Sequence, residues 1–193
     1  MFKFLLHPVK KFPRVFSVMI KTLDWLNEQG GDQTLEVGDS AALIAHVEKF
    51  HPITDEMREY VDEFLPIENM DLQVMRLLSG DEIIEVSDGV DETGFLMSLG
   101  YIAIGDFDGG VVLFNVNDAS VHVLEIDSLD LSRVEFDEDS EEYFWDDEPL
   151  EDASDDFEMA FEESSTAFSS LNEFDEVCVG VLKGEIDSAE LGI

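Results

Sequence analysis

The chain has 193 residues, 45% of them hydrophobic, and a formal net charge of −37 at pH 7. This length fits one domain with an insertion or a tail, and the apolar content suffices for a buried core, which excludes disorder along the whole chain. The negative charge excludes nucleic-acid binding through the main body, because such a surface repels phosphate groups.

Residues 1–31 are predicted to form a basic, apolar N-terminal extension of a domain that spans residues 32–193. Half of the basic residues precede the first acidic residue, Asp24, and they alternate with phenylalanines: Lys3, Lys10, Lys11, Arg14 and Lys21. The extension is either an amphipathic arm that contacts a membrane surface or a partner, or a segment that packs on its own acidic domain. We favour the second interpretation. Pro8 and Pro13 argue against a secretory signal, and Gly30 and Gly31 mark a joint.

The single cysteine, Cys178, excludes an internal disulfide bond and fits a reducing compartment. Its position among valines predicts a buried, inert thiol. No segment approaches the roughly 18 uninterrupted apolar residues that a membrane span needs. We therefore expect a cytoplasmic protein without a membrane span.

Two helices are predicted between residues 39 and 66. Asp39 or Ser40 can cap the first helix, which ends before Pro52, and Thr54 can cap the second, which ends at Pro66. Each has its apolar residues at helical spacing: Leu43, Ile44, Val47 and Phe50 in the first, and Met57, Tyr60, Val61, Phe64 and Leu65 in the second.

A short strand and a short helix are predicted next. Leu72, Val74 and Arg76 alternate with residues of the opposite face, as in a strand. Ser79 and Glu82 have the spacing of a capping box, which predicts a helix that continues to Val86.

An antiparallel meander is the strongest β prediction. Residues 95–104, 111–116 and 121–126 are apolar or β-branched, and residues 105–110 and 117–120 have turn composition. Val112, Phe114 and Val116 share one face, which predicts a sheet covered on that side by helices. An amphipathic helix is then expected to cover the sheet, with its apolar stripe at Phe168, Leu171, Phe174, Cys178 and Leu182.

The order of these motifs resembles the SUKH superfamily (Smi/Knr-like domains). The resemblance covers about residues 39–184 and is carried by Leu65-Pro66, by MRLLSGDEIIEV at 75–86, by the hairpin at 100–127 and by SSLNEF at 169–174. Members are known as immunity proteins of bacterial polymorphic toxin systems and as fungal cell-wall synthesis regulators. The resemblance implies an α+β domain with a curved antiparallel (mixed) sheet, helices packed on one face, and no enzymatic activity.

Three features depart from the family pattern. Residues 2–31 have no counterpart, the usual Asn-Gly after the first helices is absent at residues 68–70, and the acidic insertion is longer than usual. These departures leave the identity of the partner open.

The acidic insertion spans residues 135–163 and contains sixteen Asp and Glu residues but no Lys or Arg. We expect it to bind a basic protein partner, such as a nuclease-type toxin whose cationic active site accepts phosphates. Tyr143, Phe144 and Trp145 would be the desolvated anchors, within an acidic rim. The rim comprises Asp137, Glu138, Asp139, Glu141, Glu142, Asp146, Asp147 and Glu148. In the alternative interpretation, the insertion is a solvated loop whose aromatic residues pack into the domain.

No catalytic, cofactor or metal site is predicted. The four histidines, His7, His46, His51 and His122, have no metal-ligand spacing. Residues 106–110 begin like a calcium loop but lack its central glycine and its final glutamate, so a hairpin turn is favoured. Gly-rich phosphate loops and nucleophile motifs are absent.

Three hypotheses follow from the sequence. The chain is an immunity-type binder of a cationic toxin, a regulatory or scaffold protein of the SUKH type, or an ordinary domain made acidic for salt tolerance. The first predicts one tight complex that associates more slowly as salt increases, and the second predicts several weaker partners.

Overall fold

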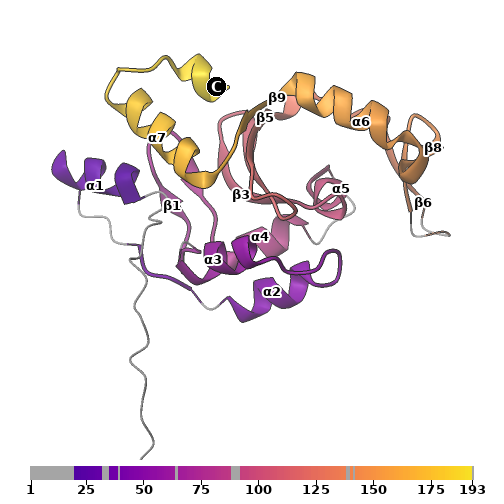
Figure 1. Cartoon of the computed structure of the whole chain (residues 1–193), viewed down its shortest axis with the longest axis horizontal. Coiled ribbons are helices and arrows are strands. Elements are labelled where there is room, and N and C mark those ends of the chain that lie inside the picture. The colour runs from indigo at the N-terminus through magenta and orange to yellow at the C-terminus, as the bar shows by residue number, and fades with distance from the viewer. Residues whose placement is uncertain are drawn as a thin grey trace, which may run out of the picture.

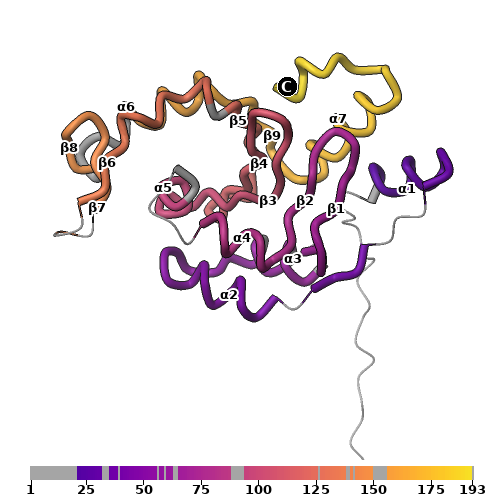
Figure 2. Tube along the Cα trace, turned by 180° about the vertical axis from the view of Figure 1, so that it is seen from behind, coloured from indigo at the N-terminus to yellow at the C-terminus, as the bar shows by residue number. Residues whose placement is uncertain are grey.

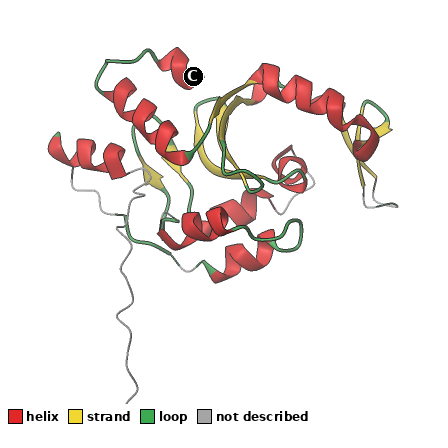
Figure 3. Cartoon of the chain, viewed as in Figure 1, coloured by secondary structure: helices red, strands yellow, loops and turns green. Residues whose placement is uncertain are grey.

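The computed structural model describes residues 20–31, 35–38, 40–63, 65–87, 92–137, 140 and 142–192. Within them the chain forms the expected α+β fold, in which helices pack against antiparallel sheets (Figure 1 and Figure 3). The larger sheet has the strand order β1-β2-β3-β4-β5-β9, and the smaller has the order β6-β7-β8. The acidic insertion contributes all of the smaller sheet except its first residue, Val134.

The helices are α1 (Ile20–Glu28), α2 (Ala41–Val47), α3 (Asp55–Glu63), α4 (Gly80–Ser87), α5 (Glu92–Ser98), α6 (Leu150–Ser164) and α7 (Leu171–Leu182). The strands are β1 (Met70–Asp71), β2 (Arg76–Leu77), β3 (Tyr101–Phe107), β4 (Gly110–Asn115), β5 (Val121–Glu125), β6 (Val134–Asp137), β7 (Glu142–Trp145), β8 (Glu148–Pro149) and β9 (Ser165–Phe168). Short 3-10 turns, among them Leu131–Arg133, complete the described elements.

The predicted helices α2, α3 and α4 are confirmed, but Ser40 makes no capping hydrogen bond with its side chain, and Asp39 lies outside the described residues. Phe50, predicted on the apolar face of the first helix, lies beyond the end of α2 and is exposed. Thr54 Oγ1 accepts a hydrogen bond of 3.2 Å from the Met57 N–H at the start of α3. At the start of α4, Ser79 Oγ accepts a longer bond of 3.4 Å from the Glu82 N–H, one half of the expected capping box. The second helix was predicted to include Leu65, but α3 ends at Glu63 and Leu65 is not helical. Phe64 lies outside the described residues.

The strand predicted at Leu72, Val74 and Arg76 is wrong in its bounds, because the chain turns within it. β1 pairs with β2 as a tight hairpin. Its turn contains Gln73 with φ of 68°, and the Asp71 carboxylate accepts a hydrogen bond of 2.8 Å from the Gln73 N–H. The alternation of polar and apolar residues does not reveal a tight turn that is stabilised by the side chain of a preceding Asp.

The prediction of one strand over residues 95–104 is also wrong. Residues up to Ser98 belong to α5, and β3 begins only at Tyr101. Gly100 lies between them with φ of 92°, a conformation that favours glycine. Phe95 of α5 and Ile102 of β3 are both buried, and a short apolar run in a buried helix cannot be distinguished from a buried strand by its periodicity.

The meander of β3, β4 and β5 is confirmed, with Ile102 and Val121 on either side of Phe114. Tyr60 of α3 stacks on the Phe114 ring at 5.5 Å between centroids, so helices cover this face as expected. The turn between β3 and β4 is tighter than predicted, because β3 continues to Phe107.

A helix also reaches the opposite face of the meander. Phe161 of α6 packs against Tyr101 and His122 at centroid distances of 4.6 and 5.2 Å. β4 is consequently buried on both sides.

The predicted C-terminal helix is confirmed as α7, with Phe174 and Cys178 facing the sheet. Phe168, however, belongs to β9, an edge strand that the helical spacing did not predict. The Phe168 ring packs on Phe174 at 5.3 Å, so it joins the same apolar stripe from the strand.

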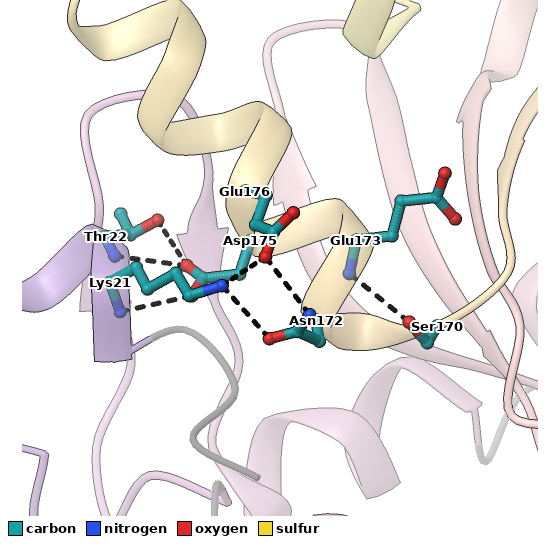
Figure 4. A network of polar contacts seen from close by, with 7 residues as sticks. All are labelled: Lys21, Thr22, Ser170, Asn172, Glu173, Asp175 and Glu176. Carbon is teal, nitrogen blue, oxygen red and sulfur yellow. Dashed lines mark hydrogen bonds and ion pairs between the residues drawn. The ribbon is translucent and has the colours of Figure 1, made fainter. Parts of the chain in front are cut away.

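Helix α1 packs against α7, as expected for an N-terminal segment that folds onto its own domain (Figure 2). The Asp175 carboxylate accepts hydrogen bonds of 3.1 Å from the N–H groups of Lys21 and Thr22, and one of 2.6 Å from Thr22 Oγ1 (Figure 4). A carboxylate from α7 therefore caps the first turn of α1. Residues 1–19 lie outside the described part of the chain.

Candidate functional site

The acidic insertion provides most of the β6-β7-β8 sheet, which lies at the opposite end of the molecule from α1, and most of α6, which runs back to the main sheet (Figure 1 and Figure 2). In β6 and β7, Glu135 faces Phe144 and Phe136 faces Tyr143 across the ladder. Since side chains alternate along a strand, the sheet has two chemically different faces. The inner face carries Val134, Phe136, Tyr143 and Trp145, and the outer face carries Glu135, Asp137, Glu142 and Phe144.

The inner face packs into an aromatic cluster. Trp145 is only 1% exposed and lies parallel to Phe95 of α5 at 6.5 Å and edge-on to Phe157 of α6 at 5.3 Å. Tyr143 contacts the Phe95 and Phe136 rings at 5.3 and 4.9 Å. These contacts fix the smaller sheet to the domain.

Trp145 is therefore not the surface anchor expected from the sequence, and Tyr143 also faces inward. The alternative interpretation was right that these two rings pack into the domain, but the described residues form strands and a helix instead of a loop. Phe144 is the remaining candidate anchor.

Arg133 secures the turn that follows Trp145. Its guanidinium carbon lies 4.2 Å from the centre of the Trp145 ring, and Nε donates hydrogen bonds of 2.9 and 3.0 Å to the two carboxylate oxygens of Asp146. These bonds hold the pKa of Asp146 below its usual range. Asp146 and Asp147 form the two-residue turn between β7 and β8, with φ of 52° and 66°, values typical of a type I′ hairpin.

An open hollow of about 420 Å³ lies around Phe144, and most of the residues that line it belong to the outer face or to the turn after β7. Its other lining residues are Glu135, Phe136, Asp137 and Asp147. All three of the charged residues are exposed carboxylates, and no Lys or Arg lines the hollow within the described part of the chain. A half-buried aromatic ring surrounded by carboxylates can accept a cationic side chain by charge attraction and by cation–π contact.

The hollow brings together only part of the predicted site. Phe144, Asp137 and Asp147 line it, and Glu142 and Glu148 are exposed on the same sheet. Asp146 is engaged by Arg133. Glu138, Asp139 and Glu141 lie outside the described residues.

Glu135 and Phe136 line the hollow but were absent from the predicted site. The alternation of apolar and acidic residues from Val134 to Asp137 is a strand signal that could have identified them.

His122 lies in a second polar cluster, between the main sheet and α6. Its Nε2 is 2.9 Å from Ser120 Oγ, and its Nδ1 is 3.4 Å from Ser165 Oγ. The ring packs edge-on against Tyr101 at 5.3 Å and against Phe161. Burial lowers the pKa of His122, and it raises the pKa of Tyr101 to about 12. The His122 ring thus joins β5 to β9 and to α6.

Cys178 lies on the buried side of α7, and burial raises the pKa of its thiol. The predicted burial of this thiol is confirmed. No group of three or more His, Cys, Asp or Glu side chains in the described ranges is arranged to hold a metal ion. No helix within those ranges is both long and apolar enough to cross a membrane.

Comparison of the chain with protein-family models, with curated proteins and with solved structures found no match.

Proposed function

We propose that the chain is a non-enzymatic protein-binding module, an immunity protein that neutralises a cognate cationic, nuclease-type toxin by direct binding. The observation that carries the proposal is the hollow in which Phe144 lies among Glu135, Asp137 and Asp147. Membership of the SUKH superfamily and a cytoplasmic location are part of the same proposal.

The chemistry of a nuclease supports this choice of partner. A nuclease active site must attract phosphate groups, so it presents Lys and Arg side chains. An acidic surface can occupy such a site in place of the nucleic acid. The charge of the whole chain would also raise the association rate, by about 10- to 1000-fold at low salt.

Phe144 would supply the apolar part of the interface. Interfaces depend on a few desolvated aromatic or arginine residues, which charged residues surround at the rim. Phe144 has this arrangement within the hollow, and Glu142 and Glu148 extend the acidic rim. Trp145 would contribute indirectly, by holding β7 in place.

A regulatory or scaffold function is the second candidate. Ile67 is 60% exposed and Val37 is 43% exposed, and both lie at the bridge between Val37 and Pro66. These exposed apolar residues lie outside the hollow and offer further contact points. A scaffold would keep its partners when the acidic hollow is altered.

The proposal is tested with the full chain immobilised and incubated with lysate of the source organism at low and at high salt. The first variant combines Glu135→Gln, Asp137→Asn and Asp147→Asn. The matched control removes three exposed carboxylates on other elements, through Glu48→Gln, Glu68→Gln and Glu85→Gln. Both variants carry the same net charge, so only the position of the lost charges differs.

We expect wild type and the control to retain one basic protein with nuclease activity, in larger amounts at low salt. The hollow variant should lose it. Equal retention of the basic protein by both variants would indicate that the interface lies outside the hollow. The absence of any basic protein at low salt would contradict the immunity function.

A further inference from the structure

The strand β6 lies at an edge of the β6-β7-β8 sheet. It pairs with β7 on one side, and no strand in the described part of the chain pairs with its other side. Such an edge presents backbone donors and acceptors to which another chain can bind.

The ladder shows which backbone groups of β6 point outward. The Asp146 N–H donates to the Arg133 carbonyl at 3.0 Å, which makes these two residues a hydrogen-bonded pair. Because such pairs alternate in an antiparallel ladder, Glu135 also bonds to β7. Val134 and Phe136 must then direct their N–H and C=O groups away from β7.

One of these outward groups is already used, since the Val134 N–H donates to the Leu131 carbonyl. The Val134 carbonyl and the N–H and C=O of Phe136 are left, and no backbone bond to them occurs among the described residues. Three backbone hydrogen bonds are thus available to an added strand.

The side chains of β6 decide which strand can be added. Glu135 and Asp137 lie on the outer face, next to the hollow, and Val134 and Phe136 lie on the inner face. A second copy of this chain would place carboxylates beside carboxylates, which is unfavourable for cross-strand neighbours. A strand that alternates basic and apolar residues would match both faces.

We propose that β6 is a docking edge for an extended basic segment of the partner, which adds to the sheet as an antiparallel fourth strand. The Lys or Arg side chains of that segment lie beside Glu135 and reach the hollow, and its apolar side chains lie beside Val134 and Phe136. This inference rests on the proposed function, because it assigns the binding mode at the same site.

The test uses three synthetic eight-residue peptides of alternating lysine and valine. One is unmodified, one is N-methylated on its valines, and one is N-methylated on its lysines. In an antiparallel pairing the valines bond to Val134 and Phe136, so methylated valines lose these bonds. We expect that peptide to bind the full chain at least about tenfold more weakly, and the lysine-methylated peptide to stay within about twofold of the unmodified one.

Two variants of the chain give an independent readout. Phe136→Pro removes the outward N–H without removing a bond to β7, and Phe136→Ala removes the same ring but keeps the N–H. Both should retain the far-UV circular dichroism spectrum of wild type. The unmodified peptide should bind Phe136→Ala more tightly than Phe136→Pro, and on wild type it should slow hydrogen exchange at the Phe136 amide.

Equal binding of all three peptides would overturn the strand addition and leave the charge-based proposal intact. Equal binding to Phe136→Pro and Phe136→Ala would overturn it as well, as would the absence of binding by every peptide. The capture of a basic nuclease from lysate tests the proposed function separately, so the two failures are distinguishable.

Discussion

Thr22 and Asp175 are 153 residues apart and are joined by two hydrogen bonds, because both the N–H and Oγ1 of Thr22 donate to Asp175 Oδ1. Asp175 is 0% exposed, and burial raises the pKa of its carboxyl group. This buried pair holds α1 against α7. The neighbouring ion pair of Lys21 with Glu176 lies in solvent.

Asp175→Ala should therefore destabilise the chain by about 2–3 kcal/mol, because it leaves the N–H groups of Lys21 and Thr22 without their acceptor. Glu176→Gln alters the exposed pair, and it should destabilise the chain far less, because exposed ion pairs contribute little to stability. Urea unfolding measures both values. Equal losses in the two variants would show that the buried cap has no special role.

Tyr60 is a position at which a substitution is expected to maintain or increase stability instead of reducing it. Its ring stacks on Phe114, but its hydroxyl group is buried and has no hydrogen-bond partner among the described residues. Tyr60→Phe keeps the stacking and removes the unpaired group, so the free energy of unfolding should stay equal or increase by about 1 kcal/mol. Tyr60→Leu, which loses the stacking, should be destabilised. Destabilisation of Tyr60→Phe in the urea experiment would indicate a missing partner.

His122 should contribute to the pH dependence of stability. Burial lowers its pKa in the folded chain, although Asp118 and Glu162 act in the opposite direction. The folded state thus binds this proton less tightly than the unfolded state, and the contribution of His122 is present above its ordinary pKa of about 6.5 and is lost as pH falls below it. Urea midpoints between pH 7.5 and 5 measure this effect.

The many carboxylates also titrate, so the informative quantity is the difference between wild type and His122→Gln. Wild type should lose more stability than the variant as pH falls. Parallel curves for the two proteins would show that the protonation of His122 does not affect folding.

Trp145 and Phe144 are neighbours in sequence but should respond differently to truncation. Trp145→Ala leaves a cavity in the aromatic cluster formed with Phe95 and Phe157, and it should lower the free energy of unfolding by about 3–5 kcal/mol. Phe144→Ala alters the half-buried ring of the hollow and should cost about 1 kcal/mol or less, while it weakens partner binding. Thermal unfolding measures the stability of both variants. A large loss of stability in Phe144→Ala would indicate that its ring belongs to the core.

Much of the fold follows from the sequence, because caps and prolines are local signals. Thr54 and Ser79 identify helix starts whose hydrogen bonds the structure contains. The boundary between α5 and β3 could not be predicted, since Phe95 and Ile102 are both fully buried and the chain is apolar on all sides there. β9 was missed because Phe168 continues the apolar spacing of α7.

The candidate site was only partly predictable, because its chemistry depends on which face of a strand each residue occupies. Composition indicated an acidic region with three consecutive aromatic residues, but Trp145 and Phe144 point to opposite faces of β7. The strand register also brings Glu135 next to Phe144. Alternation from Val134 to Asp137 was the one available signal for this pairing.

The most direct test of the immunity function is to measure whether the chain inhibits the basic nuclease that it captures. Cleavage of nucleic acid is followed while the chain is titrated into a fixed amount of that protein. We predict complete inhibition at one equivalent of wild type or of the Glu48, Glu68 and Glu85 control, and no inhibition by the Glu135, Asp137 and Asp147 variant at the same concentration. Undiminished cleavage in the presence of saturating wild-type chain would contradict the proposed function.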